Sequence, residues 1–87
     1  MKITVEGRLD TITAPLLEAE IKECITGVEN LLFDFGKLEY ISSAGLRVLL
    51  SAQKIMNKQG EMIIINTNDT IREILDITGF SDILSIE

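Results

Sequence analysis

The sequence contains no histidine and no tryptophan, and it has a single cysteine and a single proline. Without histidine or a second cysteine there is no ligand set for zinc or haem and no Ser-His or Cys-His nucleophile pair, and an internal disulfide is impossible. The phosphate-binding motifs GxGxxG and GxxxxGKS/T are also absent. We therefore expect no metal, no cofactor and no enzymatic activity.

Long hydrophobic runs are missing as well. No apolar stretch approaches the roughly 18 residues of a transmembrane helix. The opening segment, MKITVEGRLD, has no apolar signal core. With one cysteine, nothing in the sequence calls for an oxidising compartment, so a cytoplasmic protein is expected.

Positive charge is scarce, since 8 lysines and arginines face 14 acidic residues, for a net charge of −6. A nucleic-acid-binding surface needs a basic patch, and an anionic membrane attracts basic segments, so neither partner is expected. A basic protein partner fits this charge better. The 87 residues, 46% of them hydrophobic, suffice for one core and are too few for two, so residues 1–87 are expected to form a single domain.

The sequence does contain a regular alternation of strand and helix patterns. The predicted elements are strands at 2–6, 31–35 and 62–65 and helices at 14–26, 43–59 and 69–78. Residues 36–41 are expected to form a loop, and residues 80–86 a short helical turn or an edge strand. Right-handed crossovers would make the second and third strands parallel members of one sheet, with the helices packed on it.

The helix predicted at 43–59 has two different faces. Hydrophobic residues cover a wide arc, and a polar stripe occupies the opposite side. The stripe consists of Arg47, Ser51, Lys54 and Lys58. It is interpreted either as a solvated face or as part of a partner-binding surface. In the first helix, Cys24 falls on the apolar stripe and is expected in the core as a small hydrophobe.

Two serines, Ser42 and Ser43, open this long helix. Hydroxyl groups are favoured there because they accept hydrogen bonds from the unpaired N–H groups of the first turn, so helix capping is one interpretation. Phosphorylation is the other, because the partial positive charge of a helix N-terminus stabilises a phosphate. Gly45 would leave the backbone uncovered beside the hydroxyl and give a partner close access. The residue pattern alone leaves both interpretations open.

Three blocks of the chain resemble one known family. The run LEYISSAGLRVLL at 38–50 resembles the signature of STAS domains, whose bacterial members include the anti-sigma-factor antagonists. The block GRLDT at 7–11 resembles the segment before their first helix, and IREILDITGF at 71–80 resembles their last helix and its exit. The resemblance spans nearly the whole chain. It implies an α/β fold with a mixed sheet of about four strands packed by three to four helices.

The resemblance also implies a role in partner switching. In the antagonists, the unphosphorylated form binds an anti-sigma factor that is also a serine kinase, and the sigma factor is freed. Phosphorylation of a serine at the start of the long helix ends this binding, and a PP2C-type phosphatase reverses it. The acceptor position falls on Ser43, with Ser42 as the alternative. The residues expected to contact the partner are Asp10, Thr11, Ser42, Ser43, Gly45, Leu46, Arg47, Ser51 and Lys54.

The chain departs from the family pattern at several points. Ser42 stands in the position of an aspartate, Ala44 in that of a hydroxyl residue and Arg47 in that of a glycine. The strand that precedes the GRLDT block in most members is expected to be missing, and the exposed edge would then invite a second copy to form a homodimer. An alternative function is a STAS domain that is not phosphorylated, serving as a scaffold or ligand-binding subunit of a transport or signalling complex.

Overall fold

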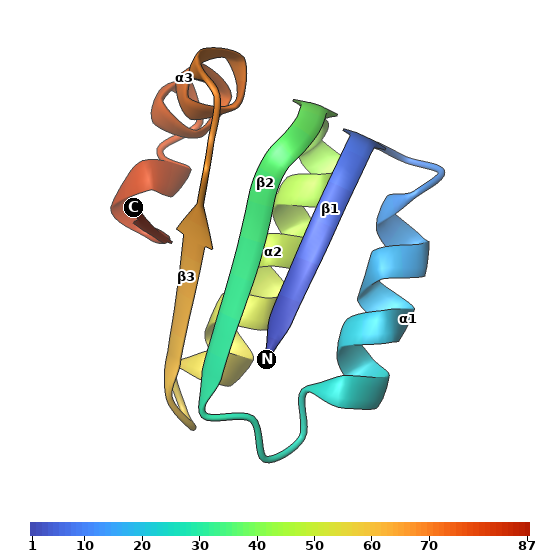
Figure 1. Ribbon diagram of the computed structural model, residues 1–87, viewed down its shortest axis with the longest axis vertical. Helices are drawn as coiled ribbons and strands as arrows, with labels where there is room; N and C mark the ends of the chain where they lie inside the picture. Colours follow the sequence, from blue (N-terminus) through green and yellow to red (C-terminus); the bar gives the residue numbers. More distant parts are fainter.

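The computed structural model describes all of residues 1–87 and contains four strands, three α-helices and one short 3-10 helix (Figure 1). The elements are β1 (Lys2–Leu9), α1 (Ala14–Cys24), β2 (Asn30–Ile41), α2 (Ser43–Met56), β3 (Glu61–Ile65), α3 (Asp69–Ile77), η1 (Phe80–Asp82) and β4 (Ser85–Ile86). The strands form one sheet in the order β1-β2-β3-β4. The predicted α/β fold with about four strands and three helices is confirmed.

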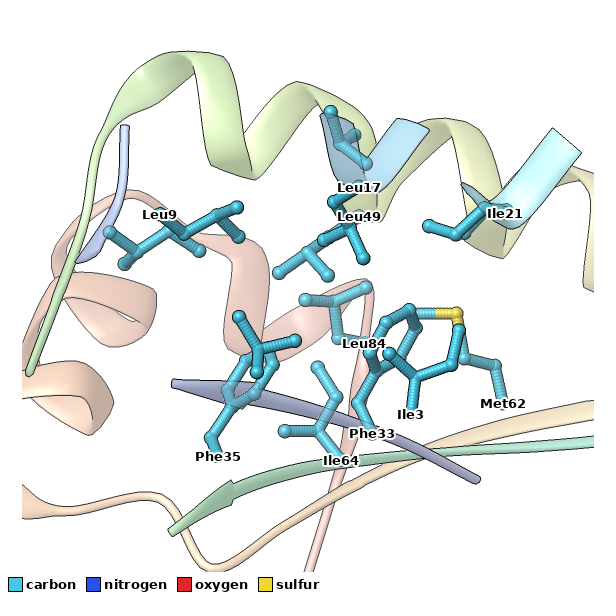
Figure 2. Packing of buried hydrophobic residues seen from close by; sticks show 14 of the residues in the cluster. Ile3, Leu9, Leu17, Ile21, Phe33, Phe35, Leu49, Met62, Ile64 and Leu84 are labelled. Atoms are coloured by element: carbon cyan, nitrogen blue, oxygen red, sulfur yellow. The ribbon is translucent and has the colours of Figure 1, made fainter. Parts of the chain in front are cut away.

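All three α-helices lie on the same face of the sheet. Each connection moves the chain one strand further in the same direction, so right-handed crossovers carry every helix to the same side. Figure 1 shows α2 behind the strands, flanked by α1 and α3. Alternate strand residues, such as Phe33, Phe35 and Ile64, point toward this helical layer and are fully buried. With helix residues such as Leu49 they form a single hydrophobic core (Figure 2).

The sheet is not mixed, in contrast to the expectation from the family resemblance. Every neighbouring pair of strands is parallel. A helix lies between each strand and the next and returns the chain to the same end of the sheet, so all strands start at that end. Parallel neighbours need a crossover connection of this kind, and each of these helices provides one.

Strand β2 is much longer than predicted, and the loop expected at 36–41 belongs to it. Its register against β1 shifts twice, once between Thr4 and Glu6 and once between Gly7 and Arg8. At each shift β2 contains one residue more than β1, which is the signature of a β-bulge. The bulges interrupt the period of two in the sequence of β2, so the pattern resembled a loop. Strand β1 likewise continues to Leu9 beyond its predicted end.

Helix α1 ends at Cys24, two residues before the predicted end, and the prediction for this cysteine was wrong. Cys24 is exposed. The buried stripe of α1 runs through Leu17 and Ile21 and continues to Ile25, which is 4% exposed. A step of four residues from Ile21 leads to Ile25, and the preceding residue turns away from the sheet.

The remaining helix ends also lie slightly inside the predicted ones. Helix α2 stops at Met56, whose carbonyl oxygen accepts hydrogen bonds from the N–H groups of Gln59 and Gly60 in the turn that follows. Helix α3 stops at Ile77. The start of α3 is capped, because the side chain of Asn68 accepts a hydrogen bond of 2.8 Å from the N–H of Ile71. None of the helices is both long and apolar enough to cross a membrane.

We expect Leu49→Ala to lower the free energy of unfolding by about 2–5 kcal/mol, because it opens a cavity at a side chain with 0% exposure in the centre of the core. Urea denaturation monitored by circular dichroism measures this loss. The matched control is Leu16→Ala, which removes the same atoms from a side chain that is 69% exposed. The control should change the stability by less than about 0.5 kcal/mol. Equal losses in both variants would contradict the description of the core.

Candidate interaction site at the start of helix α2

The carboxyl ends of β1 and β2 lie side by side, because the two strands are parallel and Leu9 is paired with Ile41. The N–H of Ser42 extends this pairing by donating a hydrogen bond of 2.8 Å to the carbonyl oxygen of Leu9. The loop that leaves β1 and the helix that leaves β2 therefore start at one edge of the sheet. Figure 1 shows both strands ending at this edge.

The first turn of α2 packs unusually close to the sheet at Gly45. A Cβ atom on Gly45 would lie 2.7 Å from Cγ of Leu9 and 2.9 Å from Cγ1 of Ile41. Glycine is thus required for the contact between α2 and the ends of the two strands. The proposed reason for Gly45, an uncovered backbone accessible to a partner, was wrong, since Gly45 is buried and faces the core. Leu46, another predicted contact residue, is only 6% exposed.

The two serines occupy different environments. Ser42 is the N-cap residue of α2, yet its side chain makes no capping hydrogen bond. Its Oγ atom is buried and has no hydrogen-bond partner. Ser43 is the first residue of α2 and is exposed. The capping interpretation therefore fails for Ser42, and Ser43 is the more exposed of the two serines.

Asp10 organises the loop between β1 and α1. Its Oδ1 atom accepts hydrogen bonds from the N–H groups of Ile12 (3.0 Å) and Thr13 (3.1 Å). These hydrogen bonds hold the pKa of Asp10 below its usual range, and the bond from Thr13 has the larger effect. The Nε atom of Arg8 lies 3.8 Å from Oδ2 of Asp10, and the Arg8 guanidinium stacks over the ring of Tyr40, 4.5 Å from its centre.

Thr13 is the N-cap residue of α1, but its side chain makes no capping bond. Its Oγ1 atom instead accepts a hydrogen bond from the N–H of Asp10 (2.9 Å) and donates one to the carbonyl oxygen of Arg8 (2.7 Å). The side chains of Asp10 and Thr13 thus both fix the loop between β1 and α1. The backbone N–H groups of Ile12 and Thr13 hold the carboxylate of Asp10 in place, and its second oxygen faces Arg8.

A pocket of about 260 Å³ lies between the starts of α1 and α2. Its lining comprises Thr11, Ala14, Pro15, Glu18, Ala44, Arg47 and Val48. The structure thus brings Asp10, Thr11, Ser43 and Arg47 to one edge of the molecule. Ser51 and Lys54 are exposed further along α2 and do not line the pocket.

Two exposed hydrophobic side chains directly follow the lining residues Thr11 and Pro15 in the sequence, and neither was predicted as part of the site. Ile12 is 80% exposed and Leu16 is 69% exposed. Ile12 lies in the turn before α1, and Leu16 lies in the first turn of α1, outside its buried stripe. For Leu16, its position off the apolar stripe of the helix was the available signal.

Comparison with known sequences supports a single family. The STAS domain model matches residues 1–87. The candidate anti-sigma factor antagonist BtrV of Bordetella bronchiseptica is 37% identical over 84 residues, which cover 94% of this chain and 72% of the relative. The anti-sigma-B factor antagonist of Listeria monocytogenes is 32% identical over 88 residues, covering 98% of this chain and 76% of the relative.

Comparison with solved structures gives the same fold. The anti-sigma factor antagonist SpoIIAA in its unphosphorylated form matches 99% of this chain and 77% of its own, with a TM-score of 0.84 and 21% identity. An anti-sigma factor antagonist from Mycobacterium paratuberculosis matches 98% of this chain and 74% of its own, with a TM-score of 0.88 and 23% identity.

The lowered pKa of Asp10 predicts a pH-dependent contribution to stability. A carboxyl group whose pKa is lower in the folded state stabilises that state above its unfolded pKa of about 3.9, and the contribution disappears as the pH falls through the lower folded value. We therefore expect wild type to be more stable than Asp10→Asn near neutral pH and the difference to shrink in acid. Urea denaturation over a pH series measures it. A difference that stays constant with pH would contradict a role for the carboxylate charge.

Proposed function

Because the chain belongs to the STAS domain family, whose model matches all of its residues, we propose that it is an anti-sigma factor antagonist that acts by switching partners. The observation that carries the proposal is the similarity to named antagonists, at 37% and 32% identity over nearly the whole chain. Residues 1–87 would act as one STAS domain without catalysis of their own. Its partner would be an anti-sigma factor that is also a serine kinase, and a sigma factor regulator of this kind works in the cytoplasm.

The phosphate acceptor in this proposal is Ser43. Its support is its position, since it is exposed and begins α2 at the edge that also carries Asp10. The first helical amides have no partner within the helix, and Ser42 supplies no capping oxygen, so a phosphate on Ser43 would have N–H donors nearby. Among solved relatives of the same fold, SpoIIAA is known in a phosphorylated form.

Phosphorylation would change the docking surface through charge. A phosphate adds a charge of about −1.5 to −2 at neutral pH, next to the pocket lined by Thr11 and Arg47. A partner that covers this pocket and the exposed Ile12 and Leu16 would then face a new anion beside an apolar contact. The cost of desolvating that anion explains how the modification ends binding while the core is untouched.

A kinase assay tests the proposed acceptor. Incubation with ATP and a cognate anti-sigma factor kinase should add one phosphate, detected by intact-mass spectrometry, and Ser43→Ala should abolish it. Ser85→Ala is the matched control, because Ser85 is an exposed serine outside the expected contact residues, and it should be phosphorylated as wild type is. Phosphate that persists in Ser43→Ala and disappears in Ser42→Ala would move the acceptor to Ser42.

A binding assay tests the switch itself. Wild type should capture the anti-sigma factor in a pull-down, and Ser43→Asp should capture it at least about tenfold less, since a charge at the contact costs over 1 kcal/mol. A PP2C-type phosphatase should restore binding of the phosphorylated protein. Equal capture by wild type and by Ser43→Asp would contradict switching. It would favour an unphosphorylated scaffold or a subunit of a transport or signalling complex.

The outer edge of β1 supports a second proposal, a homodimer. Strand β1 pairs only with β2, so its other edge presents unpaired N–H and C=O groups. A second copy could satisfy them by pairing its own β1 edge.

Sedimentation equilibrium tests this homodimer. Dimer formation is expected at tens of micromolar, with dissociation on dilution. A constant monomer mass over that range would contradict the dimer and leave the partner-switching proposal intact.

A further inference from the structure

A second pocket, of about 270 Å³, lies at the other end of α2. It is bordered by the last turns of this helix and by the first residues of β3 and the end of the chain at β4. Its polar border consists of Gln53, Asn57, Glu61, Ser85 and Glu87. The volume is near the lower end of small-molecule sites, which span roughly 300–1,000 Å³.

Gln53 is the only polar residue that is buried as a whole, with 7% exposure. Its Nε2 atom donates a hydrogen bond of 2.7 Å to Oδ1 of Asn57. Its Oε1 atom is buried and accepts no hydrogen bond. An unpaired buried acceptor costs about 1–3 kcal/mol, so a buried Gln with half its amide unused is unexpected in a purely structural role.

The surroundings of Gln53 favour a positively charged group. Glu61 and Glu87 contribute carboxylates to the border of the pocket. The carboxyl end of α2 carries partial negative charge, which also stabilises a cation. Acceptors therefore outnumber donors around the pocket, and no lysine or arginine is among its lining residues.

We propose that this pocket binds a small cation with several N–H donors, such as a guanidinium or primary ammonium group. One N–H would satisfy Oε1 of Gln53, and the positive charge would face Glu61 and Glu87. The terminal torsion of glutamine is broad, so the amide can rotate and turn Oε1 toward the pocket, which breaks the bond from Nε2 to Asn57. The bidentate geometry of a guanidinium suits the two carboxylates.

This site is separate from the one proposed for partner switching. Helix α2 has 14 residues and is therefore about 20 Å long, with Ser43 at one end and the second pocket at the other. Neither set of lining residues contains a member of the other. If no cation binds to the second pocket, the proposed function is unaffected. If the partner-switching proposal fails, the cation site is likewise unaffected.

Titration with agmatine, which carries a guanidinium and an ammonium group, tests the proposal on the full chain labelled with ¹⁵N. We expect saturable shifts, in the millimolar range, of the Gln53 side-chain amide and of the backbone amides of Gly60, Glu61 and Ser85. The amides of Thr11 and Arg47 should not move. Succinate, a dianion of similar length, should produce no saturable shift. Equal responses to agmatine and succinate, or no response at Gln53, would overturn the site.

Two variants localise the interaction. Gln53→Met keeps the length of the side chain but removes the acceptor, so agmatine should bind about tenfold more weakly, as expected for a lost hydrogen bond to a charged group. Glu61→Gln, at an exposed position that tolerates substitution, should bind severalfold more weakly and serves if Gln53→Met does not fold. Glu20→Gln removes the same charge from the exposed side of α1 and should bind as wild type does. Unchanged binding in Glu61→Gln would contradict the proposed role of charge.

Discussion

The edge of the sheet that carries the candidate interaction site depends on one close contact, between Gly45 and the ends of β1 and β2. A side chain there would overlap Leu9 and Ile41. Because Gly45 has no side chain, the first turn of α2 contacts both strands directly. This contact fixes where Ser43 emerges relative to the Asp10 loop, because each follows one of the two strands. Packing at the helix start therefore positions the site, and the serine hydroxyls contribute little to it.

The order of strands and helices could be predicted because most elements carry one clear hydrophobic period. Strand β2 was the exception, since its two bulges shift the buried side chains from one parity to the other and the alternation is lost near Gly36. The predicted burial of Cys24 was wrong for a different reason. Cys24 and Ile25 both fit a helical stripe that begins at Leu17, and only the packing of α1 against the sheet selects Ile25.

The location of the candidate site was expected from the family resemblance, which named Asp10 and Ser43. The structure gives the physical reason, because each residue follows one of two parallel strands that end at a common edge. The hydrogen bonds within the site could not be predicted. Thr13 and Ser42 both occupy positions that favour capping, yet neither caps its helix. Asp10 supplies the bonds at the start of α1, and the buried Oγ of Ser42 is turned away from the amides. Such choices between rotamers depend on neighbours that a sequence pattern does not contain.

The strand order β1-β2-β3-β4 has a consequence for how the chain reaches its native state. Each strand pairs with the strand that comes next in the sequence, across one helical crossover. No pairing between neighbouring strands therefore has to wait for a strand that is made later. A ribosome releasing the chain from its amino end would thus let β1 and β2 associate before β4 is made. Assembly can proceed strand by strand in the direction of synthesis.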